Sequence, residues 1–139
     1  KDNVVQPKSK ALGDNAKDIL GIAKVSITKF PAIAILHGAH AMANGVIKYG
    51  AYNWRAKKVI ASIYVDAALR HLGAWFEGEE LAGDSGVHHL GHAMACVAIL
   101  LDAQETGNLI DDRPITSESC IFADVLVRLN EKIAQRKQK

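Results

Sequence analysis

The chain has 139 residues, which is the size of a single domain that can bury its own core. Hydrophobic residues make up 49% of it and charged residues 23%, so the composition excludes disordered, collagen-like and coiled-coil chains. With 17 Lys and Arg against 15 Asp and Glu, the net charge of +2 is too small to indicate a nucleic acid polymer or a membrane surface as partner. The composition favours a small-molecule partner.

Neither a membrane span nor a secretory signal is visible. The longest apolar run, 93–101, is about half of what a helix needs to cross a bilayer, and the first 30 residues contain no signal-like apolar core. Cys96 and Cys120 lie in apolar patterns without a Cys-x-x-Cys spacing, which predicts two buried free thiols. We therefore expect a cytoplasmic protein, in the host cytoplasm if its source is viral.

The N-terminal part is predicted to be an arm over 1–23 that contains at most a short helix, followed by one helical domain over 24–139. Asp14 can cap a short amphipathic stretch that Pro31 ends. From Pro31 onward, apolar residues recur at helical spacing and predict a helix that ends at Tyr49.

Three further helices are expected. After a loop at 50–54, one helix runs to about Phe76, and another over about 87–104 is apolar nearly all round, which is typical of a central helix. Thr116 or Ser117 can cap the last helix. Its apolar residues recur at i, i+3, i+4, i+7 and i+11: Phe122, Val125, Leu126, Leu129 and Ile133. Four helices with almost no alternation of period two predict an all-α, four-helix-type bundle.

Each of the first three helices carries a polar stripe. The stripes are His37, His40, Asn44 and Lys48 on the first helix; Ser62, Asp66, Arg70 and Glu77, with His71 beside them, on the second; and His89 and His92, on one face with Cys96 and Ile99, on the third. Unpaired polar groups are costly in a dry core, at about 1–3 kcal/mol each. We therefore expect the stripes to meet in one space suited to a metal ion or to phosphate.

The histidines have two interpretations. A single histidine on a helix is more often a hydrogen-bonded structural residue than a ligand. The pair His89 and His92, however, follows a loop rich in carboxylates, which favours a ligand or catalytic role for the pair. For Asp66 and Arg70, a surface ion pair at i and i+4 is an equally good interpretation.

Common phosphate-binding and hydrolase motifs are missing, including the P-loop, the Rossmann fingerprint, the His-Glu-x-x-His helix and the Gly-x-Ser-x-Gly elbow. The segment KYGAYNWR at 48–55 instead combines cations for phosphate with aromatic rings on which a base can stack. The alternative is a structural loop whose rings close one end of the bundle.

Six short blocks, taken in order, carry a resemblance to a known family. They are KYGAYNWR at 48–55, DAALRH at 66–71, GEE at 78–80, DSG at 84–86, HLGH at 89–92 and DDRP at 111–114. Together they resemble the phage-type dATP/dGTP diphosphohydrolase domain family, related to the all-α NTP pyrophosphatases, over about residues 24–114. The resemblance implies a metal-dependent enzyme, a homodimer or homotetramer, that cleaves a purine deoxynucleoside triphosphate to monophosphate and pyrophosphate. In a phage, such an activity reshapes the nucleotide pool.

The metal that the resemblance implies is left open. The all-α pyrophosphohydrolases hold Mg²⁺ with Glu-x-x-Glu and Glu-x-x-Asp pairs, whereas this chain has His-x-x-His at 37–40 and 89–92. Mg²⁺ prefers oxygen ligands, and imidazole suits Mn²⁺, Co²⁺, Ni²⁺ or Zn²⁺. Either the metal is different or the histidines contact phosphate instead.

The resemblance and the residue chemistry together assign roles as hypotheses. The expected metal ligands are Glu79, Glu80, Asp84, His89 and His92, and the expected catalytic residues are His71, Asp66 and Glu80. The expected phosphate ligands are Lys48, Arg55 and Arg70, and the expected base-binding residues are Tyr49, Asn53 and Trp54. Two alternatives are a silent nucleotide-binding or oligomerising module and a metal hydrolase of another phosphorylated substrate.

Overall fold

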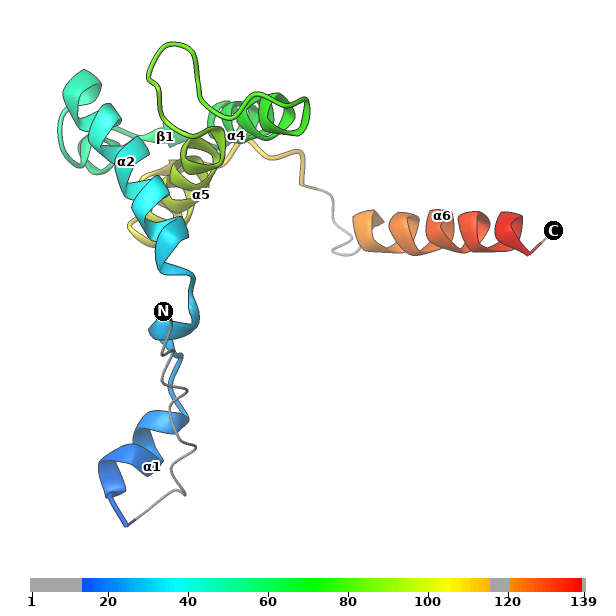
Figure 1. The fold of residues 1–139 in the computed structure, drawn as a ribbon, viewed down its shortest axis with the longest axis horizontal. Helices are drawn as coiled ribbons and strands as arrows, with labels where there is room; N and C mark the ends of the chain where they lie inside the picture. The colour runs from blue at the N-terminus through cyan, green and yellow to red at the C-terminus, as the bar shows by residue number, and fades with distance from the viewer. Residues whose placement is uncertain (1–13, 116–120, 139) are drawn as a thin grey trace, which may run out of the picture.

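The structure is a computed structural model that describes residues 14–115 and 121–138 (Figure 1). In chain order the elements are α1 (Ala16–Ile22), the 3₁₀ turn η1 (Ile27–Lys29), α2 (Ala32–Tyr49), α3 (Asn53–Ala56), β1 (Val59–Ile60), α4 (Ala61–Phe76), α5 (His89–Glu105), β2 (Leu109–Ile110) and α6 (Ile121–Lys137). Helices dominate, so the predicted all-α class is confirmed.

Helix α5 is central, as its sequence predicts, because it packs against both α2 and α4. Small residues on α5 allow the close approach, and Gly91 is the tightest point. A Cβ atom added to Gly91 would lie 2.6 Å from the main-chain oxygen of His37 on α2. Only glycine therefore fits at this crossing.

Two short strands, which the sequence pattern does not predict, connect the start of α4 to the end of α5. β1 pairs with β2 in parallel, with Val59 opposite Leu109 and Ile60 opposite Ile110. Val59 is 2% exposed, so the pairing covers part of the small core. Strands of two residues are too short for an alternation of period two to be recognised.

The predicted helix over 31–49 and the one ending at Phe76 are confirmed, with differences at their starts. Helix α4 begins only at Ala61, because the short helix α3 and strand β1 come first. The cap of α1 is Asn15 rather than the predicted Asp14, since its side-chain oxygen accepts a hydrogen bond from the main-chain N–H of Lys17 at 3.0 Å.

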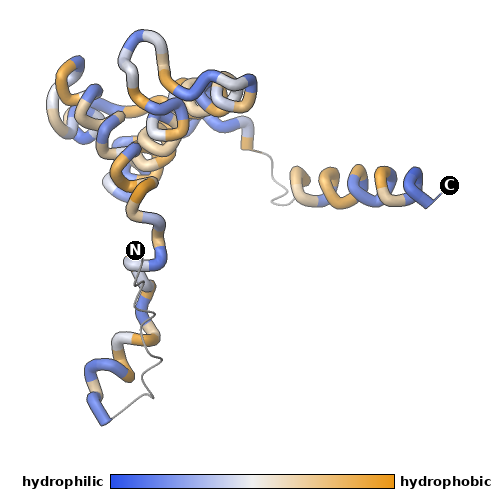
Figure 2. Tube along the Cα trace, viewed as in Figure 1, coloured by the Kyte–Doolittle hydropathy of each residue, from blue (hydrophilic) through white to orange (hydrophobic). Residues whose placement is uncertain are grey.

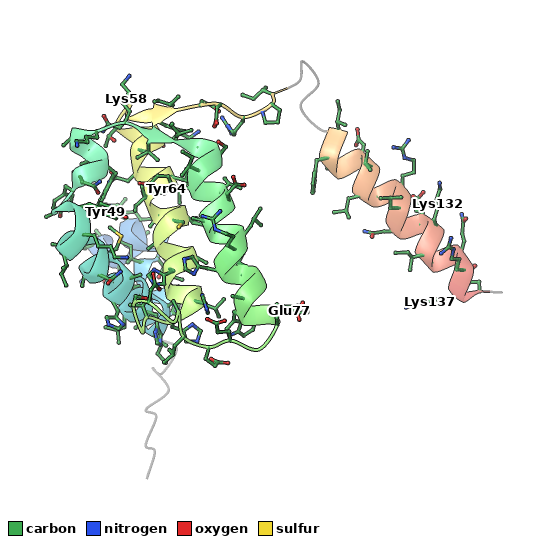
Figure 3. All side chains as sticks on the ribbon, turned by 90° about the horizontal axis from the view of Figure 1, so that it is seen from above. Tyr49, Lys58, Tyr64, Glu77, Lys132 and Lys137 are labelled. Carbon is green, nitrogen blue, oxygen red and sulfur yellow. The ribbon has the colours of Figure 1, made fainter. Side chains whose placement is uncertain are left out.

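The fourth predicted helix forms as α6, but it lies apart from α2, α4 and α5 (Figures 1 and 3) and has no buried residue. Figure 2 shows hydrophobic residues along α6 and α1, and the large apolar side chains there are exposed, among them Leu20 and Phe122. The predicted caps Thr116 and Ser117, together with Cys120, fall outside the described residues, as do 1–13 of the arm. Cys96 is a half-buried free thiol. Among the helices described, none is long and apolar enough to cross a bilayer.

Candidate functional site

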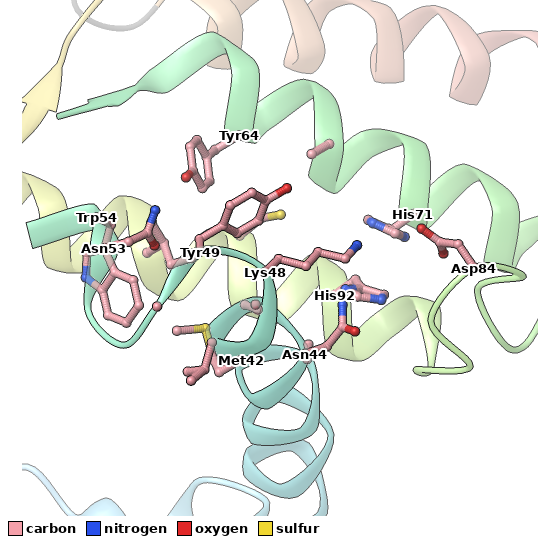
Figure 4. Close-up of a pocket in the computed structure, with 18 residues that line it drawn as sticks. Met42, Asn44, Lys48, Tyr49, Asn53, Trp54, Tyr64, His71, Asp84 and His92 are labelled. Carbon is pink, nitrogen blue, oxygen red and sulfur yellow. The ribbon is translucent and has the colours of Figure 1, made fainter. Parts of the chain in front are cut away.

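A cavity of about 270 Å³ lies where α2, α4 and α5 meet (Figure 4). It is near the lower limit of ordinary ligand pockets, which measure roughly 300–1,000 Å³. One end is polar and the other is aromatic. The polar end is formed by Asn44, Lys48, His71, Asp84 and His92, and the aromatic end by Tyr49, Asn53, Trp54 and Tyr64.

Each side of the polar end comes from a different element. Lys48 extends from the last turn of α2 toward the two histidines, His71 from α4 and His92 from α5 (Figure 4). The rings of His71 and His92 are stacked, with their centroids 4.5 Å apart. Ser85 Oγ lies 2.8 Å from His92 Nε2 and also accepts a hydrogen bond from the main-chain N–H of Val87.

The charge states at this end follow from the surroundings. Burial lowers the pKa of His71, and the neighbouring His92 and His89 lower it further. Burial is also the main cause that lowers the pKa of His92. Main-chain N–H groups of Asp84 itself and of Ser85 lower the pKa of the Asp84 carboxyl group. At neutral pH we therefore expect neutral imidazoles beside an ionised carboxylate.

Behind His71 lies a second hydrogen-bonded pair. His71 Nδ1 is 2.9 Å from Nδ1 of His89, and the other nitrogen of His89, Nε2, is 3.0 Å from Oε1 of Glu79. His89 is 6% exposed and is the only buried polar residue in the part of the chain that the structure describes. Three side chains thus form a line from an exposed carboxylate to the cavity.

The aromatic end is fixed by one carboxylate on α5. Asp102 accepts a hydrogen bond from Trp54 Nε1 at 2.7 Å, and from Arg55 Nε at 2.9 Å and Nη2 at 2.6 Å. These bonds, from Arg55 first and then Trp54, lower the pKa of Asp102 to about 2. The guanidinium of Arg55 also lies 5.1 Å from the ring centre of Tyr52, which has a left-handed backbone with φ of 55°.

Of the residues predicted for the site, Lys48, Tyr49, Asn53, Trp54, His71, Asp84 and His92 line the cavity. Asp66 and Arg70 are exposed on α4 outside the lining, and no ion pair joins them. Arg55 is held by Asp102, outside the lining.

Most of the predicted metal ligands use their atoms elsewhere. Glu79 binds His89, and Glu80 lies 3.1 Å from Nε2 of His88. Within residues 14–115 and 121–138, no three His, Cys, Asp or Glu side chains are grouped as metal ligands would be. The set Glu79, Glu80, Asp84, His89 and His92 therefore stays a prediction.

Sequence reasoning missed Ser85, Tyr64 and Asp102. The available signal for Asp102 was its place as the first charged residue after a long apolar run on α5. The DDRP block is largely structural. Asp112 accepts hydrogen bonds from the main-chain N–H and the hydroxyl group of Ser62 at the start of α4, and Asp111 pairs with Arg113 at 2.6 Å.

Comparison with curated proteins and with solved structures gave no match. Comparison with protein families gave a match over residues 14–113, to the family described as "dATP/dGTP diphosphohydrolase, N-terminal". The matched range covers α2, α4 and α5 and every residue that lines the cavity. The chain therefore belongs to the dATP/dGTP diphosphohydrolase N-terminal family, whose named activity is that of a hydrolase.

Proposed function

We propose that this protein hydrolyses dATP or dGTP to the deoxynucleoside monophosphate and pyrophosphate. The two-ended cavity carries this proposal. A triphosphate is strongly anionic, and the polar end offers a lysine cation and hydrogen-bonding imidazoles. A purine is flat and aromatic, and the other end offers rings for stacking. The name of the family supports the same substrate class.

The residues of the cavity divide between the two parts of this substrate. The Lys48 ammonium group at the polar end binds the phosphates, whereas Arg70 lies outside the cavity lining and has no part in this binding. Tyr49 and Trp54 bind the base by their rings, and Asn53 binds it through its amide group. Because Asp102 already holds the ring of Trp54, little side-chain entropy is lost when a base stacks on it. In this proposal Arg55 orders the aromatic end instead of contacting phosphate.

His71 accepts the proton of the attacking water. A neutral imidazole is needed for this role, and burial together with the neighbouring histidines lowers the pKa of His71. The Asp84 carboxylate is next to it at the same end of the cavity (Figure 4) and stays ionised, since main-chain N–H groups lower its pKa. Asp66 and Glu80 have no part in this step, because neither lines the cavity.

A divalent metal ion belongs to the proposal. Mg²⁺ in nucleotide-dependent enzymes is commonly held by one or two carboxylates and by substrate phosphate oxygens, without a full cage of protein ligands. The donor set fits this mode, because Asp84 lines the cavity while His92 Nε2 and both nitrogens of His89 are already hydrogen bonded. Such an ion would polarise the attacked phosphate and lower the pKa of bound water.

Product analysis tests the function. The protein is incubated with dATP or dGTP and Mg²⁺ or Mn²⁺, and the products are separated by anion exchange. Monophosphate and pyrophosphate in equal amounts are expected, and their formation should fall in Asp84→Asn. Orthophosphate with a diphosphate would contradict attack at the α-phosphate. Nucleotide binding without any product would instead support the silent module. In a phage-infected host, the expected reaction would change the supply of purine deoxynucleotides for replication.

We also propose that the chain self-associates as a homodimer or homotetramer. Many large apolar side chains of the single chain are exposed, among them Ile33 at 72%, Ile47 at 86% and Phe122 at 86%. Exposed apolar surface of this extent on the helices of a folded chain is typical of protein interfaces.

A further inference from the structure

Glu79, His89 and His71 form a chain of hydrogen bonds that ends at the cavity. The carboxylate of Glu79 is 3.0 Å from His89 Nε2, and the two Nδ1 atoms of His89 and His71 are 2.9 Å apart. His89 is 6% exposed, so its ring nitrogens depend on these two partners instead of water. His71 lines the cavity proposed for the substrate, whereas His89 and Glu79 do not.

The positions of the hydrogen atoms in these two hydrogen bonds follow from what each group can donate. An ionised carboxylate has no proton to give, so Nε2 of His89 carries the hydrogen and donates it to Glu79. In neutral His89, Nδ1 is then unprotonated and can only accept a hydrogen bond. A hydrogen bond between two Nδ1 atoms needs one hydrogen, which must come from His71. Neutral His71 is therefore protonated at Nδ1, and its Nε2 keeps a free lone pair.

We infer that Glu79 and His89 are positioning residues. They hold His71 in the tautomer whose Nε2 is unprotonated, and this is the atom that takes the proton of water. This inference rests on the proposed function and deepens it. Neither Glu79 nor His89 contacts the substrate, and both act through His71. The carboxylate–imidazole pair has the same orienting role that an aspartate has for a catalytic histidine in serine proteases.

The hydrogen bonds between these three side chains also let positive charge move away from the cavity. As the water oxygen bonds to the α-phosphorus and the bond to the pyrophosphate oxygen breaks, the proton of water goes to His71 Nε2. The hydrogen on His71 Nδ1 then passes to Nδ1 of His89. His71 ends neutral, and the positive charge lies on His89 beside Glu79. The proton count is conserved, and no electrons are transferred.

The decisive variant is Glu79→Lys, which replaces an acceptor by a group that can only donate. The lysine ammonium group donates a hydrogen bond to His89 Nε2, so Nδ1 of His89 becomes the hydrogen donor. His71 must then accept at Nδ1 and carry its hydrogen at Nε2, which can no longer take a proton from water. We expect kcat to fall by about 10²–10⁴-fold, the usual contribution of a general base, while KM changes less than about twofold. Glu77→Lys, in the same loop, makes the same change of charge and is the matched control.

The ¹⁵N chemical shifts of the His71 ring, recorded on the full-length resting protein, report the tautomer without any turnover. We expect a protonated Nδ1 in the wild type and a protonated Nε2 in Glu79→Lys. His89→Leu removes the partner of His71 Nδ1, so the preference for one tautomer should be lost. A hydrogen-free Nδ1 in the wild type, or an unchanged tautomer in Glu79→Lys, would overturn the inference. Failure of the wild type to form pyrophosphate would reject the proposed function, and the ¹⁵N result would still decide the tautomer.

Discussion

The carboxylate of Asp102 is the residue on which the aromatic end of the cavity depends. It joins α5 to Trp54 and Arg55, which lie 48 and 47 positions earlier in the chain. Both partners lie in the short helix α3 that follows α2, and no other hydrogen bond of their side chains is found among the described residues. Loss of this one carboxylate should therefore free the aromatic end.

This carboxylate makes stability depend on pH in a defined window. The pKa of Asp102 is about 2 in the folded protein, against about 3.9 in an unfolded chain. A lowered pKa means that the stabilisation is complete above about pH 4 and is lost as the pH falls toward 2. We expect Asp102→Asn to be less stable than the wild type at pH 7, and the difference to shrink below pH 4.

Urea unfolding between pH 2 and 7 measures this difference. Asp14→Asn is a suitable control, because Asp14 is exposed and makes no hydrogen bond or ion pair in the described structure. Equal losses of stability in the two variants at pH 7 would contradict the role given to Asp102.

Lys48 is the cation that extends into the cavity, and its removal should weaken binding of the triphosphate. A hydrogen bond to a charged group contributes about 1.5–3 kcal/mol, so Lys48→Met is expected to raise KM for dGTP by roughly 10–100-fold. Lys58→Met removes a charge of the same kind from an exposed position outside the cavity lining. Steady-state kinetics of both variants would decide, and an equal rise in both would reduce the effect of Lys48 to general electrostatics.

The sequence predicted which residues line the cavity better than it predicted which hydrogen bonds these residues make. Lys48, His71 and His92 belong to polar stripes on helices, and helical spacing alone gives their direction. The partners of His89 and Asp102 depend on how α4, the 77–86 loop and α3 lie against α5. Such distant contacts leave no periodic signal in the sequence, which is why both residues were missed or given another role.

At the scale of elements, the crossing of α2 and α5 tolerates no side chain at Gly91. A methyl group there would meet the main-chain oxygen of His37 at 2.6 Å, and a main-chain atom cannot move without displacing its helix. We expect Gly91→Ala to lower the free energy of unfolding by about 1–3 kcal/mol, as overpacking usually does. Urea unfolding measures it.

Gly73→Ala provides the matched control inside a helix. Gly73 lies within α4, and a Cβ atom there would have no neighbour within 4 Å. Alanine is a better helix former than glycine by about 0.5–1 kcal/mol, so this variant should be more stable than the wild type. Similar changes in the two variants would mean that the close approach at Gly91 has no energetic weight.

Two helices carry uncovered apolar stripes with the same spacing. On α4 the stripe is Val65, Leu69, Leu72 and Phe76, and on α6 it is Phe122, Leu126, Leu129 and Ile133. Steps of four, three and four residues are those of helices that pack side by side. The helical pattern of α6 was therefore recognisable, but the pattern could not tell which surface it packs against.

At the scale of the whole molecule, the described part of the chain leaves many large apolar side chains uncovered. Leu36, Phe76 and Phe122 are each more than two-thirds exposed. Large contiguous apolar patches are rare on monomeric proteins and mark protein interfaces. This exposure supports the proposed self-association.

The α6 stripe is the place to test this. Leu126→Asp combined with Leu129→Asp puts charges on the apolar face, and we expect the assembly to shift toward monomer. Asn130→Asp combined with Gln135→Asp adds the same charges on other faces of α6 and should leave the assembly intact. Sedimentation velocity at several protein concentrations measures both, and a wild type that is monomeric at every concentration would reject self-association.

The parallel pairing of β1 with β2 fastens the start of α4 to the end of α5, while the polypeptide link at their other ends runs through the 77–86 loop. Cleavage of the main chain between Gly78 and Glu79 would thus give two fragments that still contact each other through the paired strands and the packed helices. One piece holds Lys48 and His71, and the other holds Asp84 and His92. Neither half has a complete cavity, so this protein is suited to conversion into a split reporter whose signal appears only on reunion of its fragments.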